Sequence, residues 1–331
     1  MSSSQKNMIQ KTSGSVFHFD ALLMLIPAAV MAVYYYGTGA LLRILACTAF
    51  GVLSEAVGAW LMHCPRDLTD CSAVFIGAAT ALMLPANISY YIALSGTAFA
   101  IVVVKLPLGG TNSAPFVPTA AGYAFMTLCW PDRIFNYPAI ARESEYAQGS
   151  SLAGMLHTGI SIRPNTVKIF DILIGNVPGP MGASCALVLL ATLIYLGVRY
   201  HRSVLNALSF LAACAAIAFF FPRIHGTNAH MISLLMELCS GVLIFAALFF
   251  VTDPAISPQR RGHRLLYGLF SGVVCMLLRR FSNFEESVCF GILISNAVWP
   301  AVEIRMIRYE KKKKKARKAK RAAREEREVH A

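Results

Sequence analysis

The sequence predicts an all-α integral membrane protein of about ten transmembrane helices. Of its 331 residues, 56% are hydrophobic and only 14% are charged, whereas a soluble domain carries about a quarter charged residues. The apolar residues gather in helix-length runs, separated by short clusters of turn-forming or charged residues. Residues 1–19 are polar, and the apolar run that follows has no signal-peptidase site, so we expect the first helix to remain as an anchor.

Apolar windows and helix-breaking residues place the individual spans. In chain order they cover residues 21–36, 40–62, 72–85, 88–105, 118–130, 183–199, 204–221, 232–251, 264–279 and 286–301. The third and fifth spans are short for a bilayer. We therefore expect these two helices to be tilted, half-length or buried inside the bundle.

Lysine and arginine residues favour one orientation, because cytoplasmic loops of membrane proteins carry an excess of both. If the N-terminus is cytoplasmic, most of the basic residues also lie on the cytoplasmic side. They are Lys6, Lys11, Arg66, Lys105, Arg199, Arg202, Arg260, Arg261, Arg264 and the basic C-terminal tail. Arg279 and Arg280 stand against this assignment. The pattern predicts that both termini are cytoplasmic and that residues 131–182 form the one large extracytoplasmic loop.

The two halves of the chain resemble each other. The matching segments, first half before second, are Asp70–Ala73 with Leu238–Gly241, Leu84-Pro85 with Asp253-Pro254, and Trp130-Pro131 with Trp299-Pro300. Five helices per half is an odd number, so the second copy would be inverted relative to the first. Inverted repeats place a functional site near the membrane midplane, at their interface.

These observations predict five segments. They are a cytoplasmic N-terminal segment at 1–20, a first five-helix repeat at 21–130, the extracytoplasmic loop at 131–182, a second five-helix repeat at 183–302 and a basic cytoplasmic tail at 303–331. Most of the formal net charge of +13 lies in this tail, which contains the run Lys311–Lys315. We expect a solvated helix or a disordered tail that fixes topology and touches anionic membrane lipid, with nucleic-acid binding the less favoured alternative.

A Gly- and Pro-rich segment between two membrane helices, residues 105–118, is a candidate cofactor or pore loop. It contains Gly109, Gly110, Asn112 and Phe116. Irregular backbone at membrane depth must be buried in protein or line a cavity, because unsatisfied amides are costly in lipid. An ordinary cytoplasmic connector explains the composition equally well.

Two acidic residues lie in or near the predicted spans. Glu55 and Glu237 are ionisable groups in or near hydrocarbon, which by default suggests an ion or proton site. A hydrogen bond between helices is the simpler alternative. Asp253 precedes a proline and is interpreted as a helix terminus.

Motifs along most of the chain, from about Glu55 to Glu303, resemble the RnfD family, which supplies a membrane component of Rnf complexes, and the related B-type component of sodium-pumping quinone reductases. The matching residues are Asp70–Gly77, Leu84-Pro85, Lys105–Gly110, Pro115-Phe116, Pro118, Gly122-Tyr123, Gly175–Gly179, Ser240-Gly241, Thr252–Pro254, Ser257-Pro258, Gly262, Tyr267-Gly268, Arg279-Arg280, Asn296-Ala297 and Pro300. The resemblance implies ten helices in two inverted five-helix repeats, similar to ammonium and urea channels.

The resemblance also implies a flavin mononucleotide (FMN) joined through its phosphate to a threonine hydroxyl in the loop after the fifth helix. The family pattern reads Asp, two residues, Ser or Thr, Gly, Ala, Thr. The best match here is Glu145–Ser151, which puts Ser151 at the acceptor position beside Gly149 and Ser150, with four departures from the pattern. Thr158 is a weaker acceptor candidate, and a loop without flavin is the alternative.

A second, noncovalent flavin such as riboflavin is implied near the Gly-Gly loop, where Ala114 and Val117 replace the family's asparagines. The implied function is that of a membrane component of an ion-translocating ferredoxin:NAD oxidoreductase complex in the bacterial plasma membrane. Its implied partners are the other components of the Rnf-type complex, especially the flavinylated RnfG, and a flavin transferase. The transported ion is Na⁺ or H⁺. The alternative is a flavin-free paralogue that acts as a channel, a transporter or a scaffold.

Overall fold

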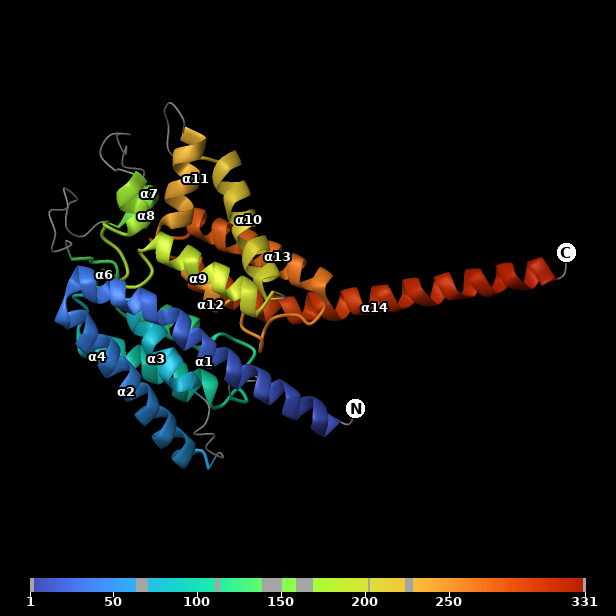
Figure 1. Ribbon diagram of the computed structural model, residues 1–331, viewed down its shortest axis with the longest axis horizontal. Coiled ribbons are helices and arrows are strands. Elements are labelled where there is room, and N and C mark those ends of the chain that lie inside the picture. The colour runs from blue at the N-terminus through green and yellow to red at the C-terminus, as the bar shows by residue number, and fades with distance from the viewer. Residues whose placement is uncertain are drawn as a thin grey trace.

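The computed structural model describes residues 3–63, 71–110, 114–138, 151–158, 169–201, 203–223 and 229–329. Within these ranges every regular element is helical and there is no strand. The helices form one bundle, and the last of them extends far beyond the others (Figure 1). The all-α prediction is confirmed.

The first half contains the helices α1 (Ser3–Tyr36), α2 (Thr38–Leu61), α3 (Ser72–Met83), α4 (Tyr90–Ala98), the π-helix η1 (Phe99–Lys105) and α5 (Pro118–Cys129). α1 turns directly into α2 at Gly37, whose φ of +71° favours glycine. Proline at the first position of α5 suits a helix start, because its missing N–H has no intrahelical partner there.

Three short helices follow: α6 (Pro131–Ile134), α7 (Leu152–Thr158) and α8 (Ile169–Ile174). The second half contains α9 (Ala186–Arg199), α10 (Val204–Phe220), α11 (Ala229–Cys239), α12 (Leu243–Phe249), α13 (Arg261–Phe281) and α14 (Val288–Val329). Each of the ten predicted spans coincides with helix in the structure.

Two boundaries differ from the prediction. The predicted span 232–251 is broken into α11 and α12, which meet at an angle of 55°. Gly241 lies at the break with a φ of +64°, a conformation that glycine adopts without strain. The first helix is longer than the predicted span 21–36, because α1 begins at Ser3, within the predicted N-terminal segment 1–20.

Among the residues that the structure describes, three helices are long and apolar enough to cross a membrane: Val16–Tyr36, Thr38–Leu61 and Val288–Arg317. The bent pair of α11 and α12 raises the number to four. α3 and α5 have 12 residues each, about 18 Å of helix against a hydrocarbon core of about 30 Å. A multi-pass membrane protein is therefore supported, while ten crossings and inverted repeats stay predictions.

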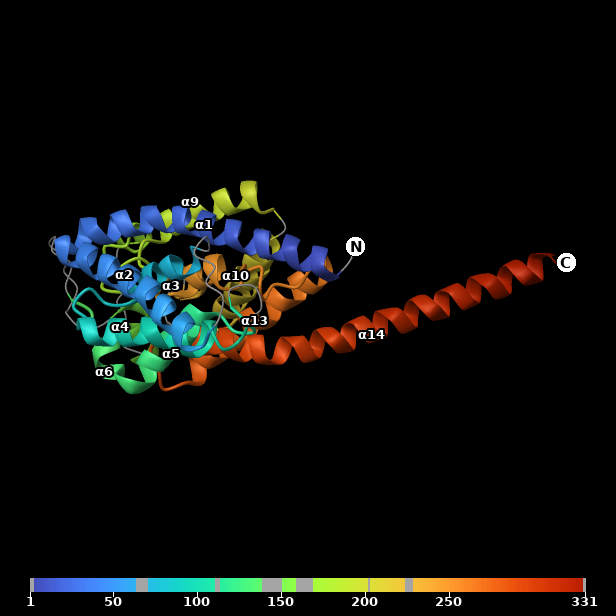
Figure 2. The same cartoon turned by 90° about the horizontal axis from the view of Figure 1, so that it is seen from below.

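The C-terminal tail is a helix that continues α14 to Val329. Figures 1 and 2 both show it projecting from the end of the bundle at which the N-terminus also lies. The tail was expected to be either a solvated helix or disordered, and the structure shows a helix.

Close contact between α2 and α3 depends on the absence of a side chain at Gly77. A Cβ atom there would lie 2.5 Å from the carbonyl oxygen of Cys47 and 2.8 Å from the Cα of Thr48. Small residues are typical of such interfaces in membrane proteins, because dispersion between closely packed backbones drives helix association in lipid.

Gly77→Ala is expected to destabilise the fold by about 1–3 kcal/mol, because a methyl group would be forced against fixed backbone. Gly262→Ala is the control, since a Cβ atom at this helical position meets nothing within 4 Å. Thermal unfolding in detergent measures both. Equal melting temperatures for the two variants would contradict this account of the interface.

Candidate functional site

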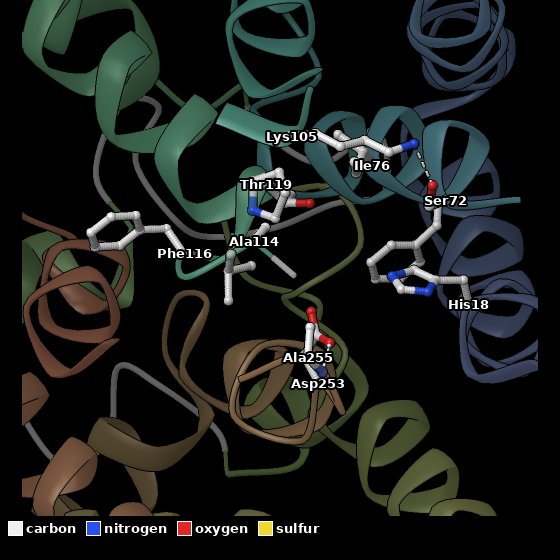
Figure 3. Close-up of a pocket in the computed structure, with 12 residues that line it drawn as sticks. His18, Ser72, Ile76, Lys105, Ala114, Phe116, Thr119, Asp253 and Ala255 are labelled. Atoms are coloured by element: carbon white, nitrogen blue, oxygen red, sulfur yellow. Dashed lines mark hydrogen bonds between the residues drawn. The ribbon is translucent and has the colours of Figure 1, made fainter. Parts of the chain in front are cut away.

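A pocket lies where elements of the two halves meet (Figure 3). Its polar wall comprises His18 of α1, Ser72 of α3, Lys105 of η1, Thr119 of α5 and Asp253, which follows α12. Phe75, Ile76 and Phe116 are among its apolar lining residues. A hollow with a few convergent polar groups on an apolar wall is the usual form of a small-molecule site.

Lys105 is the buried cation of this pocket, with 2% of its surface exposed. Its ammonium group forms an ion pair with Glu55 of α2 and donates a hydrogen bond to the hydroxyl of Ser72. The π-helical turn that ends at Lys105 is wider than an α-helical one, and such turns are frequent at functional sites. A buried lysine needs such partners, because desolvation of its charge is costly. The structure does not test the predicted cytoplasmic placement of Lys105, but its side chain is buried in the bundle.

Thr119 presents a free hydroxyl to the same pocket. The residue is 1% exposed, and its Oγ1 has no hydrogen-bond partner among the described residues. In Figure 3 it lies between Lys105 and Asp253. The Asp253 carboxylate accepts a hydrogen bond from the backbone N–H of Ala255 at 2.9 Å, so it caps the turn after α12, in keeping with its predicted role at a helix terminus.

A second buried cation, Arg279, occupies the break between α11 and α12. Its guanidinium group donates hydrogen bonds to the carbonyl of Glu237 at 3.0 Å and to the hydroxyl and carbonyl of Ser240. The carboxylate of Glu237 lies 3.5 Å from Arg279 Nε and 3.1 Å from Arg223 Nε. A carboxylate oxygen of Glu286 lies 3.9 Å from Arg279 Nη2.

The structure thus places Glu55 and Glu237 in ion pairs between elements. This agrees with the simpler of the two predicted roles, a contact between helices. Both acids also have a serine hydroxyl near their cation, namely Ser72 in the first half and Ser240 in the second. These serines are equivalent in the sequence match between the halves.

Ser151, the candidate flavin acceptor, lies at the start of α7 and is 2% exposed. Its hydroxyl donates a hydrogen bond to the carboxylate of Glu285 and accepts one from the backbone N–H of Gly154 at 3.0 Å. Glu285 lies in the connection between α13 and α14. The Ser151 cluster shares no residue with the pocket.

The other predicted site residues are dispersed. Gly109 and Gly110 have φ values of +102° and +74° in the turn after Lys105, where glycine is favoured. Phe116 lines the pocket, as expected for the Gly- and Pro-rich segment. Asn112, Gly149 and Ser150 lie outside the described residues.

Sequence reasoning missed Thr119 and Glu285. Thr119 had no distinguishing signal, because a threonine in the first turn of a helix is ordinary. Glu285 and Glu286 form an acidic pair between two apolar spans, and this pair was a usable signal for a buried or functional carboxyl.

Burial raises the pKa of Glu285 to about 7, while the hydrogen bond from Ser151 acts in the opposite direction. A carboxyl group with a raised pKa in the folded state stabilises the protein below the unfolded value of about 4.3, and this stabilisation is lost as pH rises through 7. Glu285→Gln is therefore expected to melt at a higher temperature than the parent protein at pH 8, with a smaller difference at pH 5. Melting curves across this range check the sign, and a constant difference would contradict it.

Lys105→Met is expected to destabilise the protein by about 3 kcal/mol, because it leaves Glu55 without its cation. The double variant Lys105→Met with Glu55→Gln should recover part of this loss, since it also removes the uncompensated charge. Thermal unfolding in detergent compares the two. A double variant no more stable than the single one would contradict an energetic role for the ion pair.

Comparison with known proteins agrees with the motifs. The NQR2, RnfD, RnfE family matches residues 2–312. The D subunit of the Na⁺-translocating ferredoxin:NAD⁺ oxidoreductase complex of Acetobacterium woodii is 29% identical over 91% of this chain and 92% of its own. The D subunit of the ion-translocating oxidoreductase complex of Stutzerimonas stutzeri is 28% identical, over 85% of this chain and 87% of its own length. The D subunit of the corresponding complex of Klebsiella pneumoniae is 25% identical, over 85% of this chain and 90% of its own length.

The family resemblance that the motifs predicted is thereby confirmed. The match covers both halves, the loop between them and the first part of the tail. The chain belongs to the NQR2, RnfD, RnfE family.

Proposed function

We propose that this chain is the RnfD-type membrane component of an Rnf-type complex, in which it relays electrons through bound flavin while the assembled complex moves Na⁺ or H⁺. The observation that supports this most is the extent of the similarity to the named D subunits, which covers about nine-tenths of both chains in the Acetobacterium relative. The relatives' names describe ion-translocating complexes. The electron donor and acceptor of the complex would act through other components.

Two of the buried cations, Lys105 and Arg279, support the inverted repeat. Lys105 at the end of η1 binds Ser72 at the start of α3 and pairs with Glu55. Arg279 near the end of α13 binds Ser240, just before α12, and pairs with Glu237. The ring of Phe75 in the first turn of α3 lies 5.9 Å from that of Phe249 at the end of α12. The start of one short helix therefore lies beside the end of the other, as two inverted copies require.

The contacts of Arg279 and Arg280 also support the proposed orientation. Arg279 is 1% exposed and paired with acidic groups, and Arg280 donates to the carbonyl of Phe221 at 2.9 Å. Arg279 is therefore not a free loop charge of the kind that the positive-inside rule counts. When the buried Arg279 and Lys105 are both left out, the remaining lysines and arginines still favour cytoplasmic termini.

The surroundings of Ser151 fit a covalent FMN on two conditions, of which the first is that the hydroxyl, 2% exposed and bonded to Glu285, becomes accessible. The second concerns the charge of Glu285. A phosphoester at Oγ could still accept the hydrogen bond from the Gly154 N–H, but an ionised Glu285 would repel the phosphate. With its pKa raised to about 7, Glu285 is available in the protonated form, which could donate a hydrogen bond to a phosphate oxygen. Bound FMN would supply the redox chemistry, and the protein would supply position and charge.

The pocket offers polar partners for a noncovalent flavin, but its free interior has room for only about one water molecule, so the lining side chains would have to move apart to admit the ring. Ala114 and Val117 line it without offering side-chain hydrogen bonds. Thr119 offers an unpaired hydroxyl group, whereas Ser72 and Lys105 are already bonded to each other and Lys105 is also paired with Glu55. We propose riboflavin in this pocket, with RnfG and a flavin transferase as partners on the Ser151 side.

A flavin-free paralogue, acting as a channel or a scaffold, is the second candidate. The four departures from the attachment pattern around Ser151 favour it. The same fold can serve an electron-transfer protein or a channel, so the presence or absence of bound flavin distinguishes the two candidates.

Ser151→Ala, expressed with the flavin transferase, is expected to abolish the ultraviolet fluorescence of the denatured protein band. Ser151→Thr should keep it, because threonine offers the same hydroxyl. Thr158→Ala is the matched control in the same helix and should also keep it. A parent protein without fluorescence that conducts a small solute in liposomes would instead establish the flavin-free alternative.

A further inference from the structure

Ser151 and Glu285 form a serine–carboxylate pair, although 134 positions separate them in the chain. The Ser151 hydroxyl donates a hydrogen bond to a carboxylate oxygen of Glu285, in the connection between α13 and α14. Within the described ranges, no lysine, arginine or histidine forms an ion pair with this carboxylate. The side chain bonded to Glu285 is therefore a hydroxyl group that can give up a proton.

The hydrogen bonds of Ser151 exceed what a helix cap requires. Ser151 precedes α7, and its Oγ accepts a hydrogen bond from the Gly154 N–H at 3.0 Å, as a serine at a helix N-cap does. That role uses a lone pair of the oxygen and makes no demand on the hydroxyl proton. Here the proton points at a half-buried carboxylate, while a backbone N–H holds the oxygen. A nucleophile within hydrogen-bond reach of a base, with its orientation fixed by a third group, is the pattern of an activated serine.

Gly154 lets the carboxylate approach this closely. A Cβ atom at position 154 would lie 2.8 Å from the carboxyl carbon of Glu285 and 2.9 Å from one of its oxygens. Both atoms are at the far end of a flexible side chain, so a methyl group there would displace the carboxylate and leave the backbone in place. Gly154→Ala therefore separates the two reacting groups and removes neither.

We propose that Glu285 is the catalytic base that accepts the Ser151 proton when this hydroxyl attacks a phosphorus atom. This inference rests on the proposed function, in which Ser151 receives FMN from a flavin transferase. The donor would be a dinucleotide in which a diphosphate joins FMN to AMP. Ser151 Oγ forms a bond to the FMN phosphorus, the bond from that phosphorus to the bridging oxygen breaks, and AMP leaves with the electron pair. The proton moves from Oγ to Glu285, and nothing is oxidised or reduced.

The charge of Glu285 suits both stages of this reaction. Burial raises its pKa to about 7, so the ionised and protonated forms are both populated near neutral pH, as an efficient general base requires. Before the attack, the ionised form accepts the proton. Afterwards, the protonated form can donate a hydrogen bond to an oxygen of the new phosphoester, so the carboxylate no longer repels the phosphate. Proton transfer to Glu285 would thereby meet the second condition for covalent FMN.

The test uses diisopropyl fluorophosphate, a small phosphorus electrophile that loses fluoride and needs neither transferase nor flavin. A small probe is chosen because Ser151 is 2% exposed and must become accessible by local opening. The full chain in nanodiscs is incubated with the probe between about pH 5 and about pH 9, and peptide mass spectrometry measures the labelled fraction of Ser151. The labelling rate is expected to rise with pH and to level off above about 7, where Glu285 is ionised.

Four variants separate the chemistry from the structure. Glu285→Gln is expected to lower the labelling rate about 100-fold at pH 8 and to abolish its rise with pH, because the base is gone. This variant is also expected to be more stable than the parent protein at that pH, so unfolding would not explain the loss. Gly154→Ala should lower the rate about tenfold, whereas Glu285→Asp should retain the pH dependence. Glu310→Gln, which removes a carboxylate about six helical turns beyond Val288 on α14, should label like the parent.

Equal labelling rates for the parent and Glu285→Gln overturn the proposal. So do a parent in which Ser151 is not labelled, a parent rate that does not change with pH, and an equal loss of labelling in Glu310→Gln. A parent and variants that label as expected, but gain no flavin from the transferase, support the serine–carboxylate pair and contradict only the proposed flavin attachment. Failure of this inference is therefore distinguishable from failure of the proposed function.

Discussion

Two buried cations, Arg279 and Lys105, connect helix ends inside this membrane protein. A helix that ends inside a bundle leaves carbonyl groups unsatisfied, and lipid offers them no hydrogen bonds. Arg279 donates to two such carbonyls, those of Glu237 and Ser240, at the break between α11 and α12. Lys105 binds Ser72 where α3 begins. Both cations are tolerable in the interior only because a glutamate pairs with each of them.

The same cations lie close to the two regions proposed to hold flavin. Lys105 lines the pocket between the halves. Glu286, which faces Arg279, is adjacent in sequence to Glu285, whose carboxylate contacts Ser151. Each cation is paired with a carboxylate, so a nearby isoalloxazine ring would meet an oriented ion pair and not a net positive charge. The cations that stabilise the broken helices would therefore also influence the reduction potentials under the proposed function.

Much of the architecture could be predicted from hydropathy, because a helix in lipid must be apolar over its whole length. The short α3 and α5 were predicted on this basis. The break in 232–251 was not, since the run is mostly apolar and Gly241 is its only glycine, with Ser233, Glu237 and Ser240 as its polar residues. Contacts between distant residues, such as Ser151 with Glu285, depend on tertiary packing that no local pattern encodes. Family motifs pointed to Ser151 and Phe116, but not to the hydroxyl of Thr119.

The π-helix η1 fixes the angular position of Lys105 through a difference of a single residue. A π-helical turn contains about one residue more than an α-helical turn, and one residue corresponds to a rotation of about 100°. Deleting one residue between Phe99 and Val104 would return the segment to α-helical register and swing the ammonium group away from Glu55 and Ser72. The π-helical turn therefore determines that Lys105, and not another residue of the same helix, lines the pocket.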